Sequence, residues 1–369
     1  MKTALAIIIM MLLSPAFALA GEDGITRLHD QTFNKDQTWS GTVLIDGVVQ
    51  FAPEANLTIM PGTTVKFTKT DTDKDGIGEN ELYVQGSITA NGTKDKPITF
   101  TSAEEHKRPG DWGAVNIMVS DGRKNELSNC IIEYGYRGFH MHFSKATIRD
   151  SQLRNNYLGI QCQDSQLDVT GCIISGNRGA LVFKDSKLLI KDCMLTNNYW
   201  GVRFLYGDAE MTGNTVIGNM INGITFRETT VRASGNRLRG NRKGFSAELA
   251  QVELSDNIVE NSVESGIYLK HSTGTVSGNV ITRNGNSGIS IEDSDVKIAG
   301  NEITDNSLYA IDNNGSMDVD AKGNWWGTSD SFEIKGMVFD KAKATAIGAV
   351  EFSPAAQGPL KKRNPLWLN

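Results

Sequence analysis

Three groups of residues in this sequence have types and spacings that suit chemistry, and the first is an acidic stretch near the N-terminus. Asp71, Asp73 and Asp75 alternate with other residues, a glycine follows, and Glu79 lies close behind. A D-x-D-x-D-G run holds hard carboxylate oxygens on one side of a tight loop, which suits Ca²⁺. The twelfth position is Leu82 and not glutamate, so the loop departs from the helical calcium motif. We expect a calcium loop between strands; the alternative is a solvated acidic turn.

The second group is a pair of histidines, His140 and His142, which are two of five in the chain. On a strand, residues i and i+2 point to the same face. Two imidazoles so placed can bind a transition metal or transfer a proton. No carboxylate or thiolate is placed by the sequence as a third ligand, so two surface histidines on a polar sheet are the alternative.

The third group contains carboxylates in the second half of the chain. Glu248 and Glu292 lie two repeats apart, about 9.6 Å between backbones if the repeats stack as strands. This separation overlaps that of an inverting glycosidase pair, and Asp312 lies one repeat further on in a neighbouring row. However, Arg227 and Lys270 alternate with the two glutamates in the same row, which is also how stacked strands avoid like-charge repulsion. A catalytic and a purely structural role both remain open.

Polar and aromatic side chains that suit carbohydrate lie along the same exposed strand face. The residues expected to contact a sugar are Gln161, Arg203, Arg227, Tyr268 and Lys270.

A repeat that returns every 21 to 23 residues must position all of these groups. Its first column holds small polar residues, namely Cys130, Ser151, Cys172, Cys193, Asn214, Asn236, Asn257, Asn279, Asn301 and Asn324. A second column in the same register is mostly glycine, at Gly138, Gly159, Ala180, Gly201, Gly223, Gly244, Gly266, Gly288 and Ala310. Two columns that recur with the same period over about 200 residues indicate a solenoid.

The residues after the glycine column alternate between apolar and polar types, as in Ile160, Gln161, Cys162 and Gln163. A period of two indicates strands with one face inward. Each coil therefore carries at least two short strands, and equivalent strands run parallel. We expect the first column to hydrogen-bond from coil to coil as an asparagine ladder. A further asparagine five residues on, for example Asn177, is expected to mark a turn with left-handed geometry.

The segments "NVITRNGNSGISI" and "NEITDNSLYAIDN" resemble the common repeat of the right-handed parallel β-helix family, the pectate-lyase-like fold. The resemblance covers roughly residues 39–352. "LTIMPGTTVKF" and "GDWGAV" are similar to the first coils of secreted bacterial members, and "GNWWGTSD" is similar to their closing segment. It implies an all-β, single-stranded right-handed parallel β-helix solenoid with about 21–22 residues per coil. Residues 21–126 would form the N-terminal cap and irregular first coils, 127–326 the regular coils, and 327–369 the closing segment and tail.

The first twenty residues are predicted to be a signal peptide, since Lys2 precedes an apolar stretch and Ala18-Leu19-Ala20 forms a cleavage site. The protein is therefore expected to be exported, to the periplasm, the cell surface or the medium, without a transmembrane segment in the mature chain. The net charge of −6 argues against nucleic acid, and also against strongly anionic polymers unless a basic patch or a metal intervenes. In an exported chain four cysteines raise the question of disulfides. We expect all four to be buried, stacked thiols; a bridge between Cys172 and Cys193, which are near enough, is the alternative.

Fold alone does not define function, because this fold hosts many activities. We expect a monomeric, non-catalytic protein that binds polysaccharide or another cell-envelope component, or acts as a surface adhesion scaffold, with Ca²⁺ as its one expected cofactor. The alternatives are a carbohydrate-active enzyme (lyase, hydrolase or epimerase) with its site on the exposed strand face, and a periplasmic metal-handling protein.

Overall fold

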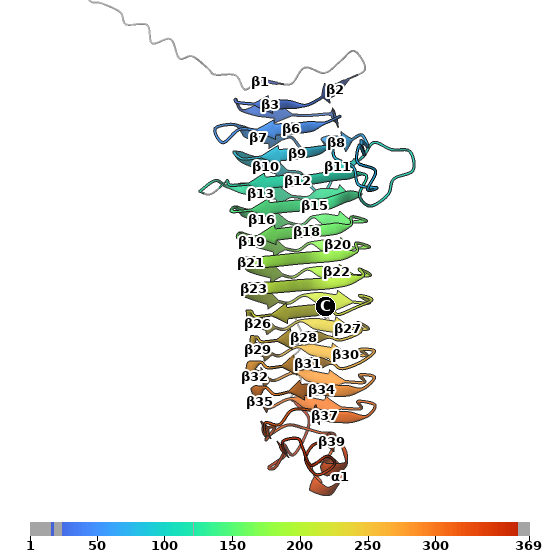
Figure 1. The fold of residues 1–369 in the computed structure, drawn as a ribbon, viewed down its shortest axis with the longest axis vertical. Helices are drawn as coiled ribbons and strands as arrows, with labels where there is room; N and C mark the ends of the chain where they lie inside the picture. Colours follow the sequence, from blue (N-terminus) through green and yellow to red (C-terminus); the bar gives the residue numbers. More distant parts are fainter. Residues whose placement is uncertain (1–15, 18–23, 121, 361–369) are drawn as a thin grey trace, which may run out of the picture.

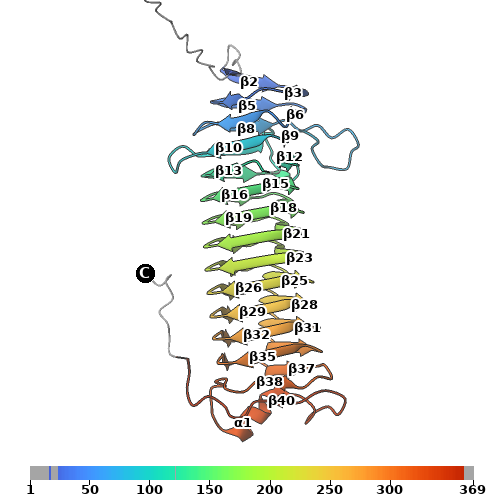
Figure 2. The same ribbon diagram turned by 90° about the vertical axis from the view of Figure 1, so that its left-hand side faces the viewer.

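The repeats stack as coils along one axis, and each regular coil contributes three parallel strands to the wall of a rod (Figures 1 and 2). The computed structural model describes residues 16–17, 24–120 and 122–360. The predicted signal peptide, apart from residues 16–17, and the end of the tail lie outside these ranges. The rod has about 13 turns of about 22 residues, which confirms the all-β solenoid.

The three strands of a coil define three faces. Face one is formed by β3 (Gln31–Phe33), β6 (Val48–Phe51), β9 (Glu81–Val84), β12 (Trp112–Met118), β15 (Gly135–His142), β18 (Leu158–Gln163), β25 (Ile224–Arg227), β28 (Phe245–Glu248), β31 (Ile267–Lys270), β34 (Ser287–Glu292), β37 (Tyr309–Asn313) and β39 (Val338–Phe339). Face two is formed by β1 (Ala16–Phe17), β4 (Gln37–Trp39), β7 (Asn56–Ile59), β10 (Ser87–Asn91), β13 (Asn125–Ser128), β16 (Lys145–Arg149), β19 (Gln166–Thr170), β26 (Thr230–Ser234), β29 (Gln251–Ser255), β32 (Thr273–Ser277) and β35 (Asp295–Ala299). Two long strands, β21 (Gly179–Lys191) and β23 (Trp200–Thr212), run across both faces.

Face three is a separate sheet. It is formed by β2 (Ile25–Leu28), β5 (Thr42–Ile45), β8 (Thr64–Phe67), β11 (Ile98–Ser102), β14 (Cys130–Glu133), β17 (Gln152–Arg154), β20 (Ile173–Ser175), β22 (Met194–Thr196), β24 (Thr215–Ile217), β27 (Arg237–Arg239), β30 (Ile258–Glu260), β33 (Val280–Thr282) and β36 (Glu302–Thr304). At the C-terminal end, the helix α1 (Ser331–Gly336) and the paired strands β38 (Val319–Asp320) and β40 (Val350–Glu351) cover the last coil, beside the buried Trp326.

Inward side chains fill the rod with a continuous apolar core, and polar ladders line its corners. The first column forms the predicted ladder: the Asn257 backbone N–H and Nδ2 both donate to Asn279 Oδ1 at 2.9 Å, and Asn279 Nδ2 donates to Asn301 Oδ1 at 2.9 Å. The prediction of left-handed geometry for the second asparagine column is wrong. Asn177 is buried and bonds to Asn198 in a second ladder, and the preceding residue takes the positive φ, as Asn197 does at 56°. The asparagine side chain points into the rod to form the ladder, so the turn is made by the residue before it.

A third ladder consists of serines and was not predicted from the sequence. The Ser144 N–H donates to Ser165 Oγ at 3.1 Å, and the Ser165 N–H donates to Ser186 Oγ at 3.2 Å. The four cysteines are buried free thiols, and the Cys172 N–H donates to Cys193 Sγ at 3.4 Å within the first ladder. No helix in the described part of the chain is long and apolar enough to cross a membrane.

Candidate functional site

The carboxylates predicted for catalysis lie on face one near the C-terminal end, where other side chains already engage them. Lys270 Nζ lies 2.6 Å from Glu292 Oε1, and the Tyr268 hydroxyl donates to Glu292 Oε2 at 2.9 Å. The lysine holds the pKa of Glu292 below its usual value, and burial, assisted by Glu292, raises the pKa of Tyr268 to about 12. Glu248 lies opposite Lys270 on the neighbouring strand, which completes a row of alternating charge.

The remaining residues of that region also have local partners. Burial raises the pKa of Asp312, whose carboxylate accepts from Asn314 Nδ2 at 2.8 Å. Arg227 Nε lies 3.4 Å from Glu228, and Lys243 Nζ covers the Tyr268 ring at 4.0 Å from its centroid. The charged and polar side chains of this part of face one are therefore already paired with one another.

The acidic loop lies between β8 and β9, near the opposite end of the rod. Asp71, Asp73 and Glu79 each present one carboxylate oxygen within 4.8 Å of the others; Asp75 is not part of this group. Asp71 Oδ1 is buried without a hydrogen-bond partner, whereas Asp75 Oδ1 accepts from the Ile77 N–H at 2.8 Å. Hydrogen bonds from Thr72 lower the pKa of Glu79, which keeps it ionised. The loop supplies three hard ligands that could hold a calcium ion.

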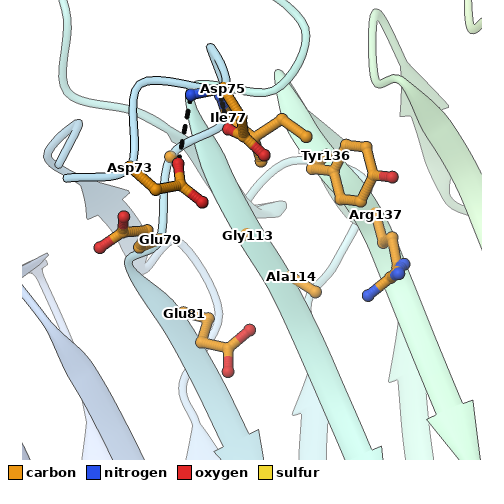
Figure 3. A pocket seen from close by; sticks show the side chains of 10 residues that line it. Asp73, Asp75, Ile77, Glu79, Glu81, Gly113, Ala114, Tyr136 and Arg137 are labelled. Atoms are coloured by element: carbon orange, nitrogen blue, oxygen red, sulfur yellow. Dashed lines mark hydrogen bonds between the residues drawn. The ribbon is translucent and has the colours of Figure 1, made fainter. Parts of the chain in front are cut away.

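A cavity of about 170 Å³ separates this loop from face one (Figure 3). Asp73, Asp75 and Glu79 lie on its loop side, Glu81 on β9, and Tyr136 and Arg137 on β15 beyond Gly113 and Ala114 of β12. A Cβ atom at position 113 would come within 3.2 Å of the Glu81 side chain, so the glycine makes room for that carboxylate. Burial raises the pKa of Glu81, and Arg137 Nε is buried without a hydrogen-bond partner.

The histidine pair lies beside this cavity at the end of a hydrogen-bonded chain. Asn116 Nδ2 donates to Glu81 Oε2 at 2.7 Å, and Asn116 Oδ1 lies 2.7 Å from His140 Nδ1. His140 Nε2 lies 3.0 Å from His142 Nε2. Burial lowers the pKa of His140 to about 3 and also lowers the pKa of His142, so both rings are neutral at pH 7. Gln161 occupies the position opposite His140 on the next strand, β18.

A row of aromatic and arginine side chains, which the sequence analysis missed, runs along the corner between faces three and one. We call it the aromatic–arginine strip. It contains Tyr136, Arg137, Tyr157, Arg178, Tyr199, Trp200 and Arg203. The 21-residue spacing of Tyr136, Tyr157, Arg178 and Tyr199 was a usable signal, because it places one of them on each successive coil.

Contacts between neighbouring coils hold the strip together. The Tyr136 and Tyr157 rings lie 5.0 Å apart, and Arg178 lies 4.8 Å from the Tyr157 centroid and 5.5 Å from the Trp200 ring. Arg203 lies 5.0 Å from Trp200 on the other side. Among the described residues, no carboxylate lies within 4.0 Å of the guanidinium nitrogens of the three arginines in the strip. The strip thus joins aromatic faces to arginines that form no ion pair with a described carboxylate, although the charge of Arg137 also acts on nearby Glu81 and opposes the rise of its pKa.

The stacked coils and two family matches define the class: the chain is a right-handed parallel β-helix protein. The family model described as "Right handed beta helix region" matches residues 99–242, and "Periplasmic copper-binding protein (NosD)" matches residues 206–337. No curated protein matches the chain.

Solved structures with a similar course of the chain include a mutant of the periplasmic alginate epimerase AlgG (15% identity; 88% of this chain and 74% of that chain; TM-score 0.40). Others are the A-module of the Azotobacter vinelandii mannuronan C-5 epimerase AlgE6 (12%; 91% and 91%; 0.40) and the Streptococcus pneumoniae surface adhesin PfbA (14%; 76% and 84%; 0.40). At such low sequence identity and TM-score, these structures say nothing about the function of this chain.

The copper-binding name fits the residues of its own matched segment poorly. Residues 206–337 contain one histidine, His271, and no cysteine. Among the described residues, the one group of three or more histidine, cysteine or acidic ligand atoms within 4.8 Å is the acidic loop, which lies outside that segment and offers hard oxygen ligands. The side chains of residues 206–337 therefore do not fit a copper site.

Proposed function

We propose that this chain is an exported β-helix protein that binds an acidic polysaccharide along the aromatic–arginine strip. The single observation that carries the proposal is the run of arginines without carboxylate partners, each in contact with an aromatic ring. Arginine suits the carboxylates of such a polymer because its planar guanidinium can donate two parallel hydrogen bonds. Aromatic rings suit the apolar faces of sugar rings.

The arginines on the C-terminal half of the rod provide the contrast. Arg232 pairs with Glu253 at 3.2 Å, Arg237 with Glu260 at 2.7 Å, and Arg242 with Glu264 at 2.6 Å. Those charges are already compensated from coil to coil, so they offer little to an anionic ligand. In a protein with a net charge of −6, the exposed Arg178 and Arg203, which form no ion pair with a described carboxylate, therefore favour local binding of a polyanion.

The dimensions of the strip suit an extended chain. Tyr136 and Tyr199 are three coils apart, about 14 Å at the spacing of parallel strands. Successive sugar rings of a linear polymer could therefore lie along successive coils. Export, expected from the N-terminal sequence and in keeping with the periplasmic name of one matching family, would expose the strip to such polymers.

Binding should be measured by calorimetry and affinity electrophoresis with a polyuronate, and with dextran as the neutral polymer. Arg178→Ala removes one charge and two ring contacts. A hydrogen bond to a charged group contributes about 1.5–3 kcal/mol, so loss of the contact between this guanidinium and a ligand carboxylate should lower the affinity tenfold or more. Trp200→Ala should have a similar effect, and binding should weaken as salt is raised.

Arg232→Ala is the matched control, because it removes an exposed arginine from face two. It should bind as the wild type does, with an unchanged melting temperature. Equal loss of affinity in Arg178→Ala and Arg232→Ala would refute the strip as the binding surface. Equal binding of dextran and polyuronate would refute the acidic specificity.

Catalysis on the same polymer is the second candidate, favoured by the raised pKa of Glu81 beside Arg137 in the cavity at the end of the strip. A carboxyl group that stays protonated to a higher pH can act as a general acid. Release of reducing ends or unsaturated products by the wild type, abolished in Glu81→Gln, would replace simple binding with an enzymatic function.

A further inference from the structure

We infer that the cavity at the N-terminal end of the aromatic–arginine strip holds the terminal sugar residue of an acidic polysaccharide, so that the protein binds chain ends and not internal segments. The inference rests on the proposed function, because it requires the polymer to lie along the strip. The loop between β8 and β9 ends the path of the polymer at this point.

The cavity lies on the line of the strip, where one side chain of the row is missing. Gly113 of β12 lies beside Tyr136 of β15, because its two neighbours in the chain pair with the two neighbours of Tyr136. On its other side, Tyr136 has the ring of Tyr157 at 5.0 Å. The row of large side chains therefore ends at a position without a side chain, and the cavity lies there.

The cavity has room for one sugar ring. Its volume is about 170 Å³, and a cavity of about 150 Å³ takes a ring the size of benzene. One six-membered sugar ring therefore fits, whereas two linked rings do not. The loop forms the far wall, with Asp73 and Asp75 across the cavity from Tyr136 (Figure 3). A polymer that follows the strip from Tyr157 towards Tyr136 meets this wall after one more ring.

The two walls of the cavity offer a terminal uronate two kinds of partner. Arg137 Nε is buried without a hydrogen-bond partner, so it can donate to the carboxylate of the sugar. On the loop side, Asp75 Oδ1 accepts from the Ile77 N–H at 2.8 Å, which leaves Oδ2 to accept from a sugar hydroxyl. Asp75 is not one of the three candidate calcium ligands of the loop, so an ion bound there would not occupy it.

The carboxylates that line the cavity fix the orientation of the ligand. Asp73, Asp75 and Glu79 all lie on the loop side, so repulsion between like charges keeps the ligand carboxylate away from that wall. Burial raises the pKa of Glu81, which reduces the negative charge beside Arg137. The terminal uronate is therefore held with its carboxylate on Arg137 and its hydroxyls towards the loop.

The number of proteins bound to each polymer chain tests the inference. Polyuronates fractionated by length should be mixed with an excess of the purified protein, and the mass of the complex measured by sedimentation equilibrium. We expect one protein per chain at every length, because each chain has one end of the kind that fits. A number that rises with length, while Arg178→Ala still weakens binding, would overturn chain-end binding and leave the proposed function intact. Absence of binding to any polyuronate would overturn both.

Replacement of the loop is the second test. The Glu79 N–H donates to the Thr70 carbonyl at 2.8 Å, which is the bond that closes a β-turn, so a two-residue Asn-Gly turn can replace residues 71–78. Several copies of this variant should bind each long chain, since the polymer can then continue past the cavity. A variant that keeps the cooperative thermal unfolding of the wild type but still binds one copy per chain would contradict the role of the loop.

Arg137→Ala tests the contact inside the cavity without changing the loop. A hydrogen bond to a charged group is lost, so the affinity for a short oligouronate should fall tenfold or more. Arg149→Ala is the matched control, because it removes an exposed arginine from β16 on face two, and it should bind as the wild type does. Equal affinities of the wild type and a folded Arg137→Ala variant would overturn the inference.

Discussion

The asparagine ladder allows a stability prediction whose size follows from its contacts, and the Asn279→Ala substitution tests it. Asn279 is fully buried, and its Oδ1 accepts from the backbone N–H of Asn257. Its Nδ2 donates to the Leu254 carbonyl at 2.9 Å and to Asn301 Oδ1. Alanine removes all of these bonds and leaves a small void.

The cost depends on which partners are left without a bond. Asn257 Nδ2 keeps the Ala233 carbonyl, and Asn301 Oδ1 keeps the backbone N–H of residue 279. The Asn257 N–H loses its side-chain acceptor, and the Leu254 carbonyl loses a donor. A buried polar group left unsatisfied costs about 1–3 kcal/mol, so we expect a total loss of about 2–4 kcal/mol.

The chain itself suggests a graded control. Ser151 occupies the same column, where its Oγ accepts from the Cys130 N–H at 3.0 Å and donates to the Arg149 carbonyl at 2.7 Å. Asn279→Ser can therefore keep the backbone N–H satisfied, and we expect about half the loss seen with alanine. Asn286→Ala, on the exposed surface of the next coil, should change stability by less than about 0.5 kcal/mol.

Urea unfolding and native-state hydrogen exchange should be measured together, because solenoids can open locally and need not unfold in one step. In Asn279→Ala the Asn257 amide should exchange faster than in the wild type. A loss of stability no larger than that of the surface control, with the Asn257 amide still protected, would refute this account of the ladder.

Four further outcomes are expected. Adding Ca²⁺ to chelator-treated protein should raise its melting temperature, and Asp73→Asn should remove the increase; no calorimetric heat with Ca²⁺ would rule out the calcium loop. Burial opposes ionisation of Glu260, but Arg237 and Arg283 outweigh it and lower its pKa. Its stabilisation is therefore complete above the unfolded pKa near 4.3 and disappears as pH falls through the lower folded pKa. Wild type and Glu260→Gln should differ by about 1–3 kcal/mol at pH 7 in urea titrations and converge only once the pH falls below the folded pKa. Glu292→Gln should lower stability by less than about 1 kcal/mol and leave polysaccharide binding intact. Loss of binding in this variant would show that the polysaccharide binds around Glu292 and not along the strip. Alkylation of the unfolded, unreduced protein should label all four cysteines in the mass spectrum, and a pair protected by a disulfide would contradict the free thiols.

The period of the sequence was sufficient to predict the fold, because each coil repeats the same inward and outward pattern. It also predicted the first ladder, since a buried column of asparagines has few other ways to satisfy its amides. It predicted at least two strands in each coil and did not resolve the third, which lies on face two, as in β19. The sequence also predicted the wrong residue for the left-handed turn: the positive φ belongs to the residue before the inward asparagine, as Asn197 shows, and not to the asparagine itself.

The sites show a similar division. The acidic loop and the histidine pair were found from the sequence, because their members are neighbours along the chain. The partners of Glu292 follow from strand register, but whether its carboxylate stays free depends on the directions of Lys270 and Tyr268. Those directions are set by packing and not by spacing.

The sequence by itself determined the architecture: a periodic pattern of inward apolar residues and corner asparagines has one compact solution, a stack of parallel coils. Only the tertiary structure decided which side chains meet at the candidate site. Glu81, Asn116 and His140 come from three successive strands of face one, and the open cavity beside Glu81 is bounded on one side by the loop that precedes β9. Contacts of this kind join residues tens of positions apart in the irregular first coils, where the repeat is too imperfect for a column of the sequence to show which side chains meet.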